Sequence, residues 1–125
     1  DLHSFPTRRS SDLHIGLPPR WLACAEEFLR ESFTEHLTLA QVASAAGVHP
    51  VYLAREFRRF HGCTIGEYIR RLRVERARRQ LSTSDESLAT IAAGSGFSDQ
   101  SHFSRTFKRL LGMTPAQYRA SFDRR

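Results

Sequence analysis

The sequence predicts an all-α protein that contains a duplicated helix-turn-helix unit. Three observations support this fold class: apolar residues recur at three- and four-residue steps from Leu17 onward, capping motifs mark several helix starts, and one segment occurs twice. A chain of 125 residues forms one domain or two very small ones, because a single core is served by roughly 100 to 150 residues. No apolar run approaches the roughly 18 residues needed to span a bilayer, which excludes a membrane-spanning protein.

The first helix is expected after Pro18 and Pro19, since proline suits the first turn of a helix. An apolar stripe at helical spacing follows and should face a core; it consists of Trp21, Leu22, Ala25, Phe28, Leu29 and Phe33. We interpret the opposite face as an acidic surface exposed to solvent; it carries Glu26, Glu27, Glu31 and Glu35.

Further helix starts are marked by three capping boxes. In each, a threonine hydroxyl can accept from the third backbone amide of the helix while a longer side chain reaches back to the cap. The boxes pair Thr38 with Gln41, Thr64 with Glu67, and Thr114 with Gln117. Two more helices are expected to be capped by Ser87 and Ser98, and another to start at His49 and Pro50.

The internal repeat relates residues 39–68 to residues 88–118. Gly47 corresponds to Gly96 and Phe57 to Phe107, with one extra residue in the second copy. Each copy has a short helix, a turn at glycine and a longer basic helix. Glycine supplies the left-handed conformation that a tight inter-helix turn requires, so each copy is interpreted as a helix-turn-helix.

The charge balance favours a polyanionic partner. The chain has 19 Lys and Arg against 13 Asp and Glu, a net charge of +6, and Lys108 is its one lysine. Arginine's planar fork suits phosphates and guanine edges. The excess lies between residues 55 and 79, and composition alone leaves nucleic acid and an acidic membrane surface both open.

Metal binding and catalysis have little support in the sequence. Cys24 and Cys63 match no metal or redox spacing and are expected to be reduced thiols. His61 beside Cys63 lacks a second pair to close a tetrahedral zinc site.

Ser98, Asp99 and His102 lie too close together on one helix to aim at a common reacting atom. We therefore predict no metal, no cofactor and no catalytic residue, and expect a protein that is not an enzyme.

The stretch IAAGSGFSDQSHFSRTFKRLLGMTPAQYR, residues 91–119, resembles the signature of the AraC/XylS family of bacterial transcription regulators. The first repeat is similar to that family's N-terminal helix-turn-helix, and the resemblance covers about residues 17–122. It implies about seven helices in two helix-turn-helix subdomains, joined by a long connecting helix from Ile65 to Leu81. Residues 14–125 would form the DNA-binding domain, with 14–63 as the first subdomain, 64–82 as the connecting segment and 83–125 as the second subdomain.

The resemblance also implies that two recognition helices enter successive major grooves of promoter DNA. On a helix starting near Asp99, Phe103 and Phe107 face the core, which leaves polar residues near the N-terminal end to meet base edges. The predicted base-reading residues are Val51, Ala54, Arg55, Gln100, Ser101, His102, Ser104 and Arg105. The predicted phosphate-contacting residues are Arg58, Arg59, Lys108 and Arg109.

Several of these residues have specific expected roles. Glutamine pairs with adenine and arginine with guanine, whereas Val51 and Ala54 are short and apolar. Readout by the first helix is therefore expected to rest on Arg55 and on thymine methyl contacts. His102 is as compatible with packing beside a phosphate as with reading a base, and Asp99 is expected in the first helical turn.

Other side chains are interpreted as structural. The helical spacing of the aromatic residues favours core positions over base stacking; they are Phe57, Phe60, Tyr68, Phe103, Phe107 and Tyr118. The arginines between positions 70 and 79 are divided between lining DNA and pairing with Glu67 and Glu75. Arg73 is a candidate for a structural bond.

Residues 1–13, DLHSFPTRRSSDL, resemble a widely used short-read sequencing adapter translated in frame. The alternative is a flexible arm whose Arg8 and Arg9 reach into a minor groove, and we favour the adapter. The segment has no helical or strand period, so it is expected to be disordered. On this interpretation it is a non-native scar, and the effector and dimerisation domain is missing from this chain.

The sequence thus predicts a sequence-specific DNA-binding transcription regulator of the bacterial cytoplasm, associated with the nucleoid. The resemblance implies a transcription activator that contacts RNA polymerase. No contact with a membrane is expected. A sequence-independent basic module is one alternative, and it predicts a salt slope of about 0.9 per phosphate neutralised with no preferred site. A helical protein-interaction module is the other, and it predicts exposed apolar residues on the longer helices.

Overall fold

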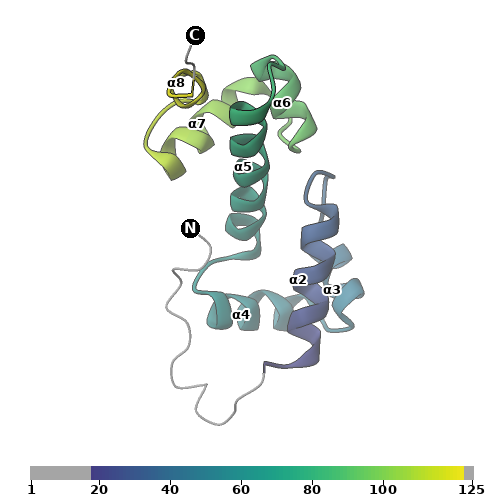
Figure 1. The fold of residues 1–125 in the computed structure, drawn as a ribbon. Helices are drawn as coiled ribbons and strands as arrows, with labels where there is room; N and C mark the ends of the chain where they lie inside the picture. Colours follow the sequence, from purple (N-terminus) through teal and green to yellow (C-terminus); the bar gives the residue numbers. More distant parts are fainter. Residues whose placement is uncertain (1–17, 123–125) are drawn as a thin grey trace. The chain divides into compact units, whose positions relative to one another are not determined.

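The computed structural model describes residues 18–122, and the expected disorder of residues 1–13 lies outside this range. The described residues form seven helices and no strand (Figure 1). The helices are α2 (Arg20–Ser32), α3 (Leu39–Ala46), α4 (Pro50–His61), α5 (Ile65–Thr83), α6 (Leu88–Gly94), α7 (Gln100–Leu111) and α8 (Pro115–Ala120). This confirms the all-α fold class. Helix α5 is the predicted long connecting helix, two residues longer at its C-terminal end than expected.

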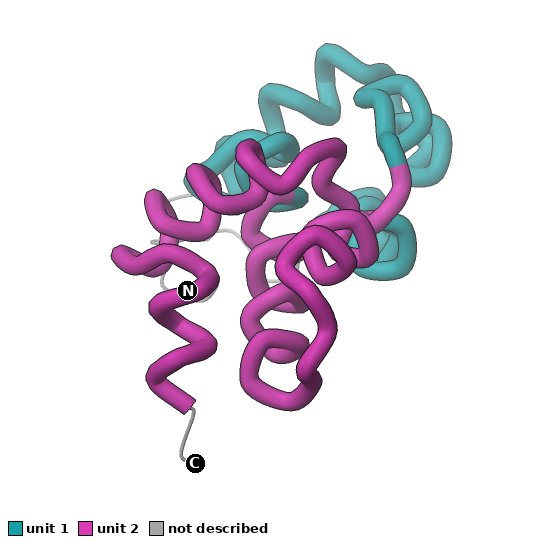
Figure 2. The backbone as a smooth tube through the Cα atoms, turned by 90° about the horizontal axis from the view of Figure 1, so that it is seen from above, with its two compact units in different colours: residues 1–32, 36–69 teal, residues 33–35, 70–125 magenta. Residues whose placement is uncertain are grey.

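The chain divides into two compact units (Figure 2). Among the described residues, unit 1 holds 18–32 and 36–69, and unit 2 holds 33–35 and 70–122. Because the division falls within α5, the subdomain boundaries drawn from the sequence stay a prediction. None of the helices in residues 18–122 is long and apolar enough to cross a bilayer.

Unit 1 is built on α3, which packs against both α2 and α4. The apolar stripe of α2 faces inward as expected at Leu22, Ala25 and Leu29, while Trp21 and Phe28 are half-buried. The other buried apolar residues of the unit are Val42, Ala43, Leu53, Phe57, Cys63, Ile65, Tyr68 and Ile69.

One residue of the expected acidic surface of α2, Glu26, is only partly exposed to solvent. The Oε2 atom of Glu26 lies 2.7 Å from Nε2 of His61 at the end of α4, and the His61 ring stacks on Phe57 at 4.3 Å. The prediction was wrong for Glu26 because an imidazole 35 residues away provides a partner that draws the carboxylate inward.

The helix starts follow the capping rules closely. All three capping boxes are present, with hydrogen bonds between the threonine and the Gln or Glu of 2.8 to 3.1 Å. His49 caps α4 through Nδ1, which accepts from the Val51 amide at 3.1 Å, and Ser87 caps α6.

The expected cap at Ser98 was wrong, and so was the placement of Asp99 in the first turn. Asp99 is itself the N-cap of α7, because its Oδ1 accepts from the His102 amide at 2.7 Å. An N-cap side chain reaches the second or third amide of the helix, and Ser98 lies one residue too early for this contact.

The internal repeat is also a repeat of backbone structure. Helices α4 and α7 each have 12 residues, and each ends at a glycine with positive φ, at 74° for Gly62 and 83° for Gly112. In each copy a tyrosine packs edge-on against the equivalent buried phenylalanine of the longer helix. Tyr68 lies 5.3 Å from Phe57, and Tyr118 lies 5.6 Å from Phe107.

Unit 2 encloses an apolar cluster between α5, α6 and α7. Its buried members are Val74, Ala77, Leu81, Ile91, Ala92, Phe97, Phe103 and Phe107, with Leu88, Leu110 and Tyr118 packed against them. The interpretation of the aromatic residues as core is confirmed for Phe57, Tyr68, Phe103 and Phe107. Phe60 and Tyr118 are half-buried.

A buried hydroxyl in this unit provides a test of packing. Thr106 is 1% exposed, and its Oγ1 has no hydrogen-bond partner within residues 18–122. Thr106→Val removes the unpaired hydroxyl at nearly constant shape, so we expect the free energy of unfolding to rise by about 1 kcal/mol. Thr106→Ser keeps the hydroxyl and loses a methyl group, and it should be destabilising. Urea denaturation measures the stability of both variants. A Thr106→Val variant less stable than Thr106→Ser would contradict this account.

Two arginines on α5 make structural hydrogen bonds within unit 2. Arg73 donates from Nε to the Phe33 carbonyl at 2.7 Å and from Nη2 to the Glu35 carbonyl at 2.9 Å. Arg76 donates to Ser95 Oγ at 3.1 Å. The structural role considered for Arg73 is therefore confirmed.

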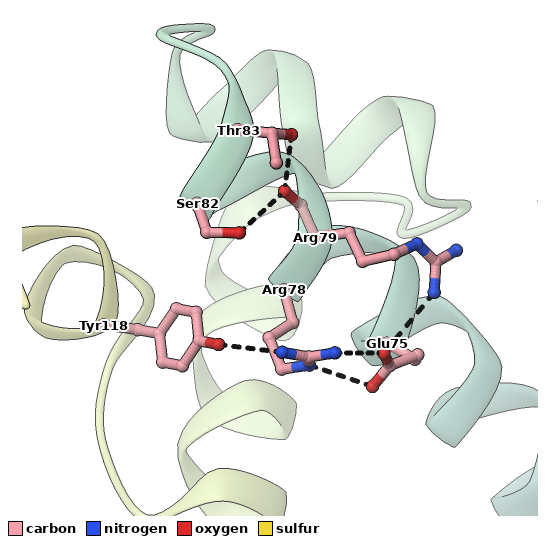
Figure 3. A network of polar contacts seen from close by, with 6 residues as sticks. All are labelled: Glu75, Arg78, Arg79, Ser82, Thr83 and Tyr118. Carbon is pink, nitrogen blue, oxygen red and sulfur yellow. Dashed lines mark hydrogen bonds and ion pairs between the residues drawn. The ribbon is translucent and has the colours of Figure 1, made fainter. Parts of the chain in front are cut away.

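Arg78 connects α5 to α8 (Figure 3). Its Nη1 donates to the Tyr118 hydroxyl at 3.0 Å, and its Nε and Nη2 donate to the two oxygens of Glu75. Arg79 reaches the same carboxylate at 3.4 Å, and its carbonyl accepts from the hydroxyls of Ser82 and Thr83. The expected pairing of arginines in this stretch with Glu75 is thus present.

The ion pair between Glu75 and Arg78 predicts a small loss of stability in acid. The hydrogen bonds from Arg78 hold the pKa of Glu75 below its ordinary value. A carboxylate with a lowered folded-state pKa stabilises above its unfolded-state pKa and loses that contribution as the pH falls through the folded-state value. Because the Glu75 side chain is 42% exposed, solvent screening keeps the contribution below about 1 kcal/mol.

Urea denaturation of the wild type and Glu75→Gln at about pH 7 and about pH 2 measures this contribution. The two proteins should differ at the higher pH and converge at the lower one. An equal difference at both pH values would contradict the assignment.

Candidate nucleic-acid interface

Helix α4 turns one face to the core and the other to solvent. Leu53 and Phe57, four residues apart, are fully buried, so the opposite side of the helix faces outward. Val51 is 64% exposed, and Ala54, Arg55 and Arg58 are exposed as well.

The outward face of α4 borders a mostly apolar groove. It is lined by Leu39, Val51, Ala54, Arg55, Arg58, Thr64, Ile65 and Gly66. The structure therefore brings four of the predicted site residues together, and it adds Leu39 from the start of α3 and the first turn of α5. An apolar residue directly after a capping threonine is the signal that could have pointed to Leu39, which is 40% exposed.

Helix α7 repeats this arrangement in unit 2. Phe103 and Phe107 are fully buried, and a shallow hollow on the outer side is lined by Gln100, Ser101, Ser104 and Arg105. Four of the five residues predicted to read bases on this helix thus share one surface.

His102 is the fifth, and it lies apart from that hollow. It is half-buried, and its ring meets Phe97 edge-on at 5.5 Å. This packing on an aromatic side chain gives His102 a structural contact that the sequence did not predict. Its choice between a phosphate and a base edge stays a prediction.

The predicted phosphate-contacting residues lie in the last turns of the two helices. Arg58 and Arg59 on α4 and Lys108 and Arg109 on α7 are exposed. Cations also offset the partial negative charge at a helix C-terminus. Their position is therefore compatible with stabilising the helices and with meeting a phosphate backbone.

Two side chains of α4 that the sequence did not single out contact the predicted site. Glu56 accepts from Arg55 Nε at 3.0 Å and from Arg59 Nη1 at 2.8 Å. The Tyr52 ring lies 5.6 Å from Cζ of Arg55. Their helical spacing from Arg55 is visible in the sequence, but the side-chain directions are not.

Within the described residues, no group of three or more His, Cys, Asp or Glu side chains is placed to hold a metal ion. Cys24 is exposed and Cys63 is buried, and neither forms a disulfide.

Comparison with known proteins identifies the family. A family model described as a helix-turn-helix domain matches residues 42–121. A transcriptional regulator from Chromobacterium violaceum, described as one of the AraC-type DNA-binding domain-containing proteins, has a TM-score of 0.77 and 30% identity, covering 83% of this chain and 93% of that one. The chain belongs to the AraC family of helix-turn-helix regulators. The resemblance drawn from the two repeats is confirmed.

Two further transcription regulators are also similar to this chain. The transcriptional activator AarP of Providencia stuartii is 35% identical over 94 residues, which covers 75% of this chain and 70% of AarP. The DNA-binding domain of AdpA, solved with a target DNA, has a TM-score of 0.78 and 30% identity, covering 83% of this chain and 94% of that domain. The fold is that of a sequence-specific DNA-binding transcription regulator.

This AraC-type chain matches only part of some longer relatives. AdaA of Bacillus subtilis, described as a bifunctional transcriptional activator and DNA repair enzyme, is 30% identical over 91% of this chain. The chain spans 54% of the length of AdaA and 35% of the regulator YisR of the same species.

Proposed function

We propose that the chain recognises a specific promoter sequence in double-stranded DNA, with α4 and α7 as the two reading helices. The observation that carries this proposal is the equivalent placement of Arg55 and Arg105. Each lies on the exposed face of a 12-residue helix, two residues before a fully buried phenylalanine. A duplicated reading surface predicts an operator with two parts.

The chemistry of the two faces assigns different tasks to them. On α7, Gln100 can pair with adenine and Arg105 with guanine, and each good pair is worth about 1–3 kcal/mol of discrimination. On α4, Arg55 is the one base reader with a long polar side chain, and Val51 and Ala54 suit thymine methyl groups. The first DNA segment is therefore read by fewer hydrogen bonds.

Phosphate contacts supply affinity without sequence information. Arg58 and Arg59 serve the first segment in this proposal, and Lys108 and Arg109 serve the second. Each phosphate neutralised adds about 0.9 to the slope of log affinity against log salt.

The biological role follows from this binding activity. AarP is described as a transcriptional activator, which supports activation as the role of this chain. The same proposal includes contact with RNA polymerase on the nucleoid. The chain would act by binding and not by catalysis, because the polar residues on its exposed faces suit groove recognition.

Random-sequence DNA selection with the wild-type chain, Arg55→Ala and Arg105→Ala at fixed salt tests the proposal. We expect a bipartite motif, one half of which relaxes with each variant. If no sequence is enriched and all three proteins lose affinity equally with salt, the chain is a sequence-independent basic module and the proposal fails.

A protein-interaction role has one observation in its favour. Helix α4 exposes Val51 at 64% and Tyr52 at 40%, whereas the equivalent positions of α7 hold Ser101 and His102. A role in protein binding would therefore use the N-terminal end of α4 and not that of α7. Val51→Ser should reduce affinity for operator DNA if the exposed valine contacts thymine, and should leave it unchanged if the valine serves a protein partner.

A further inference from the structure

We infer that Glu56 is a positioning residue for DNA reading by α4: its carboxylate holds Arg55 and Arg59 in one fixed arrangement that α7 lacks. The inference rests on the proposed function of α4 as a reading helix. It deepens that function by distinguishing a pre-organised first reading surface from an unconstrained second one.

Both oxygens of the carboxylate are engaged. Oε2 of Glu56 accepts from Nε of Arg55 at 3.0 Å, and Oε1 accepts from Nη1 of Arg59 at 2.8 Å. The Glu56 side chain is 14% exposed, while those of Arg55 and Arg59 are 64% and 56% exposed. A largely buried anion thus anchors two arginines whose charged ends remain in solvent.

Aromatic rings support the same two arginines. Cζ of Arg55 lies 5.6 Å from the Tyr52 ring, and Cζ of Arg59 lies 6.0 Å from the Phe60 ring. Trp21 of α2 meets both rings edge-on, at 5.7 Å and 6.2 Å. Cation–π contacts at exposed sites are individually weak, but together with the Glu56 bonds they restrict the rotamers of both arginines before any DNA arrives.

The atoms used by Glu56 decide what each arginine can still do. Arg55 is held through Nε, so its two terminal nitrogens are left to make a bidentate contact with guanine O6 and N7. Arg59 is held through Nη1, one of the terminal nitrogens of its fork. Its remaining donors suit a phosphate oxygen better than the edge of a base.

The second repeat shows the same pair of arginines without this support. Arg105 and Arg109 have the spacing of Arg55 and Arg59, but neither has a hydrogen bond, ion pair or ring contact within residues 18–122. The three supporting residues are all different in the second copy, which has His102 for Tyr52, Thr106 for Glu56 and Leu110 for Phe60.

Glu56 also lowers the positive charge of the first reading surface. A carboxylate beside Arg55 and Arg59 repels any phosphate that approaches without engaging the arginines, so it selects against binding in a wrong register. Pre-organisation reduces the entropy lost when the correct contact forms. Both effects raise the preference for the correct sequence in the first segment and leave the second segment untouched.

The test compares the wild-type chain with Glu56→Gln, which is nearly isosteric and removes the charge. Glu27→Gln, an exposed position on α2, is the matched control for the same change in net charge. Binding is measured by fluorescence anisotropy at fixed salt on four duplexes. These are the selected operator, an operator with one base pair changed in the segment assigned to Arg55, one with a change in the segment assigned to Arg105, and a non-operator sequence.

For Glu56→Gln we expect discrimination in the first segment to fall by about three- to tenfold, discrimination in the second to stay the same, and affinity for the non-operator duplex to rise. Glu27→Gln should match the wild type on all four duplexes. The inference would be overturned if Glu56→Gln discriminated as well as the wild type in the first segment. It would also be overturned if the variant lost discrimination equally in both segments. A wild-type chain that prefers no sequence would instead remove the proposed function, and the inference with it.

Discussion

Replacing Gly96 with alanine is expected to lower the free energy of unfolding by about 3 kcal/mol, because two separate costs add at this position. Gly96 has a φ of 102°, and left-handed backbone costs an L-residue roughly 1–2 kcal/mol. An added Cβ would also lie 2.8 Å from Nε of Arg73, 2.9 Å from Cα of Thr34 and 3.0 Å from the Phe33 carbonyl oxygen. Two of these are backbone atoms, so the strain of overpacking adds about 1–3 kcal/mol.

The first repeat provides the matched control. Gly47 occupies the equivalent turn with a φ of 74°, and a Cβ there would meet nothing within 4 Å. Gly47→Ala should therefore cost only the backbone term, about 1 kcal/mol. Urea denaturation of the two variants measures the difference, and equal losses would show that crowding at Gly96 is relieved at no cost.

The crowding at Gly96 has a structural origin. Arg73 approaches this turn because it donates to the carbonyls of Phe33 and Glu35, and no other residue type leaves space for it. The next residue, Phe97, is 4% exposed and belongs to the apolar cluster of unit 2. Glycine thus lets the chain pass Arg73 and still place Phe97 in the core.

The local features of the fold could be predicted because they depend on neighbours in sequence. The capping box at Thr38 needs only a side chain three residues away, and the core positions Phe103 and Phe107 follow from helical spacing. The repeat added long-range information, because a match between distant segments predicts that they fold alike. Together these signals predicted the helices, most of their caps and the buried face of each reading helix.

The predictions failed where a side chain meets a partner that is distant in sequence, or where the direction of a side chain decides which contact forms. No local pattern reveals that Glu26 meets His61, since 35 residues separate them. Ser98 and Asp99 are both acceptable caps, and the backbone conformation selects Asp99. The sequence made no prediction about the packing of His102 against Phe97, because that contact depends on a rotamer that the sequence does not specify.

The candidate site was predicted as a set of exposed residues, without the contacts that organise them. Exposure follows from the positions of the buried residues on α4 and α7, so the outer faces could be inferred. The bridge from Glu56 to Arg55 and Arg59 could not, because adjacent and three-apart charges on a helix can equally remain solvated. The role of each residue toward DNA stays a prediction until binding is measured.

Arg105→Ala is expected to remove about 1–3 kcal/mol of discrimination at one base pair of the operator. Arg105 is exposed beside Gln100 and Ser104 in the hollow of α7, near the end of the helix that meets base edges. Without the guanidinium, no side chain at this position can make a bidentate contact with guanine. Competition binding with the four base pairs tested in turn at that position should show nearly equal affinities for the variant.

Lys108→Ala provides the contrast that separates base reading from phosphate contact. Lys108 lies in the last turn of α7, and its ammonium is a point charge suited to phosphate. Its removal should weaken binding to all sequences evenly and reduce the salt slope by about 0.9, with the base preference intact. If Arg105→Ala behaves in this same even way, Arg105 contacts the backbone. Sequence reading by α7 would then rest on Gln100 and its serine neighbours, because they are the other polar side chains that line the hollow.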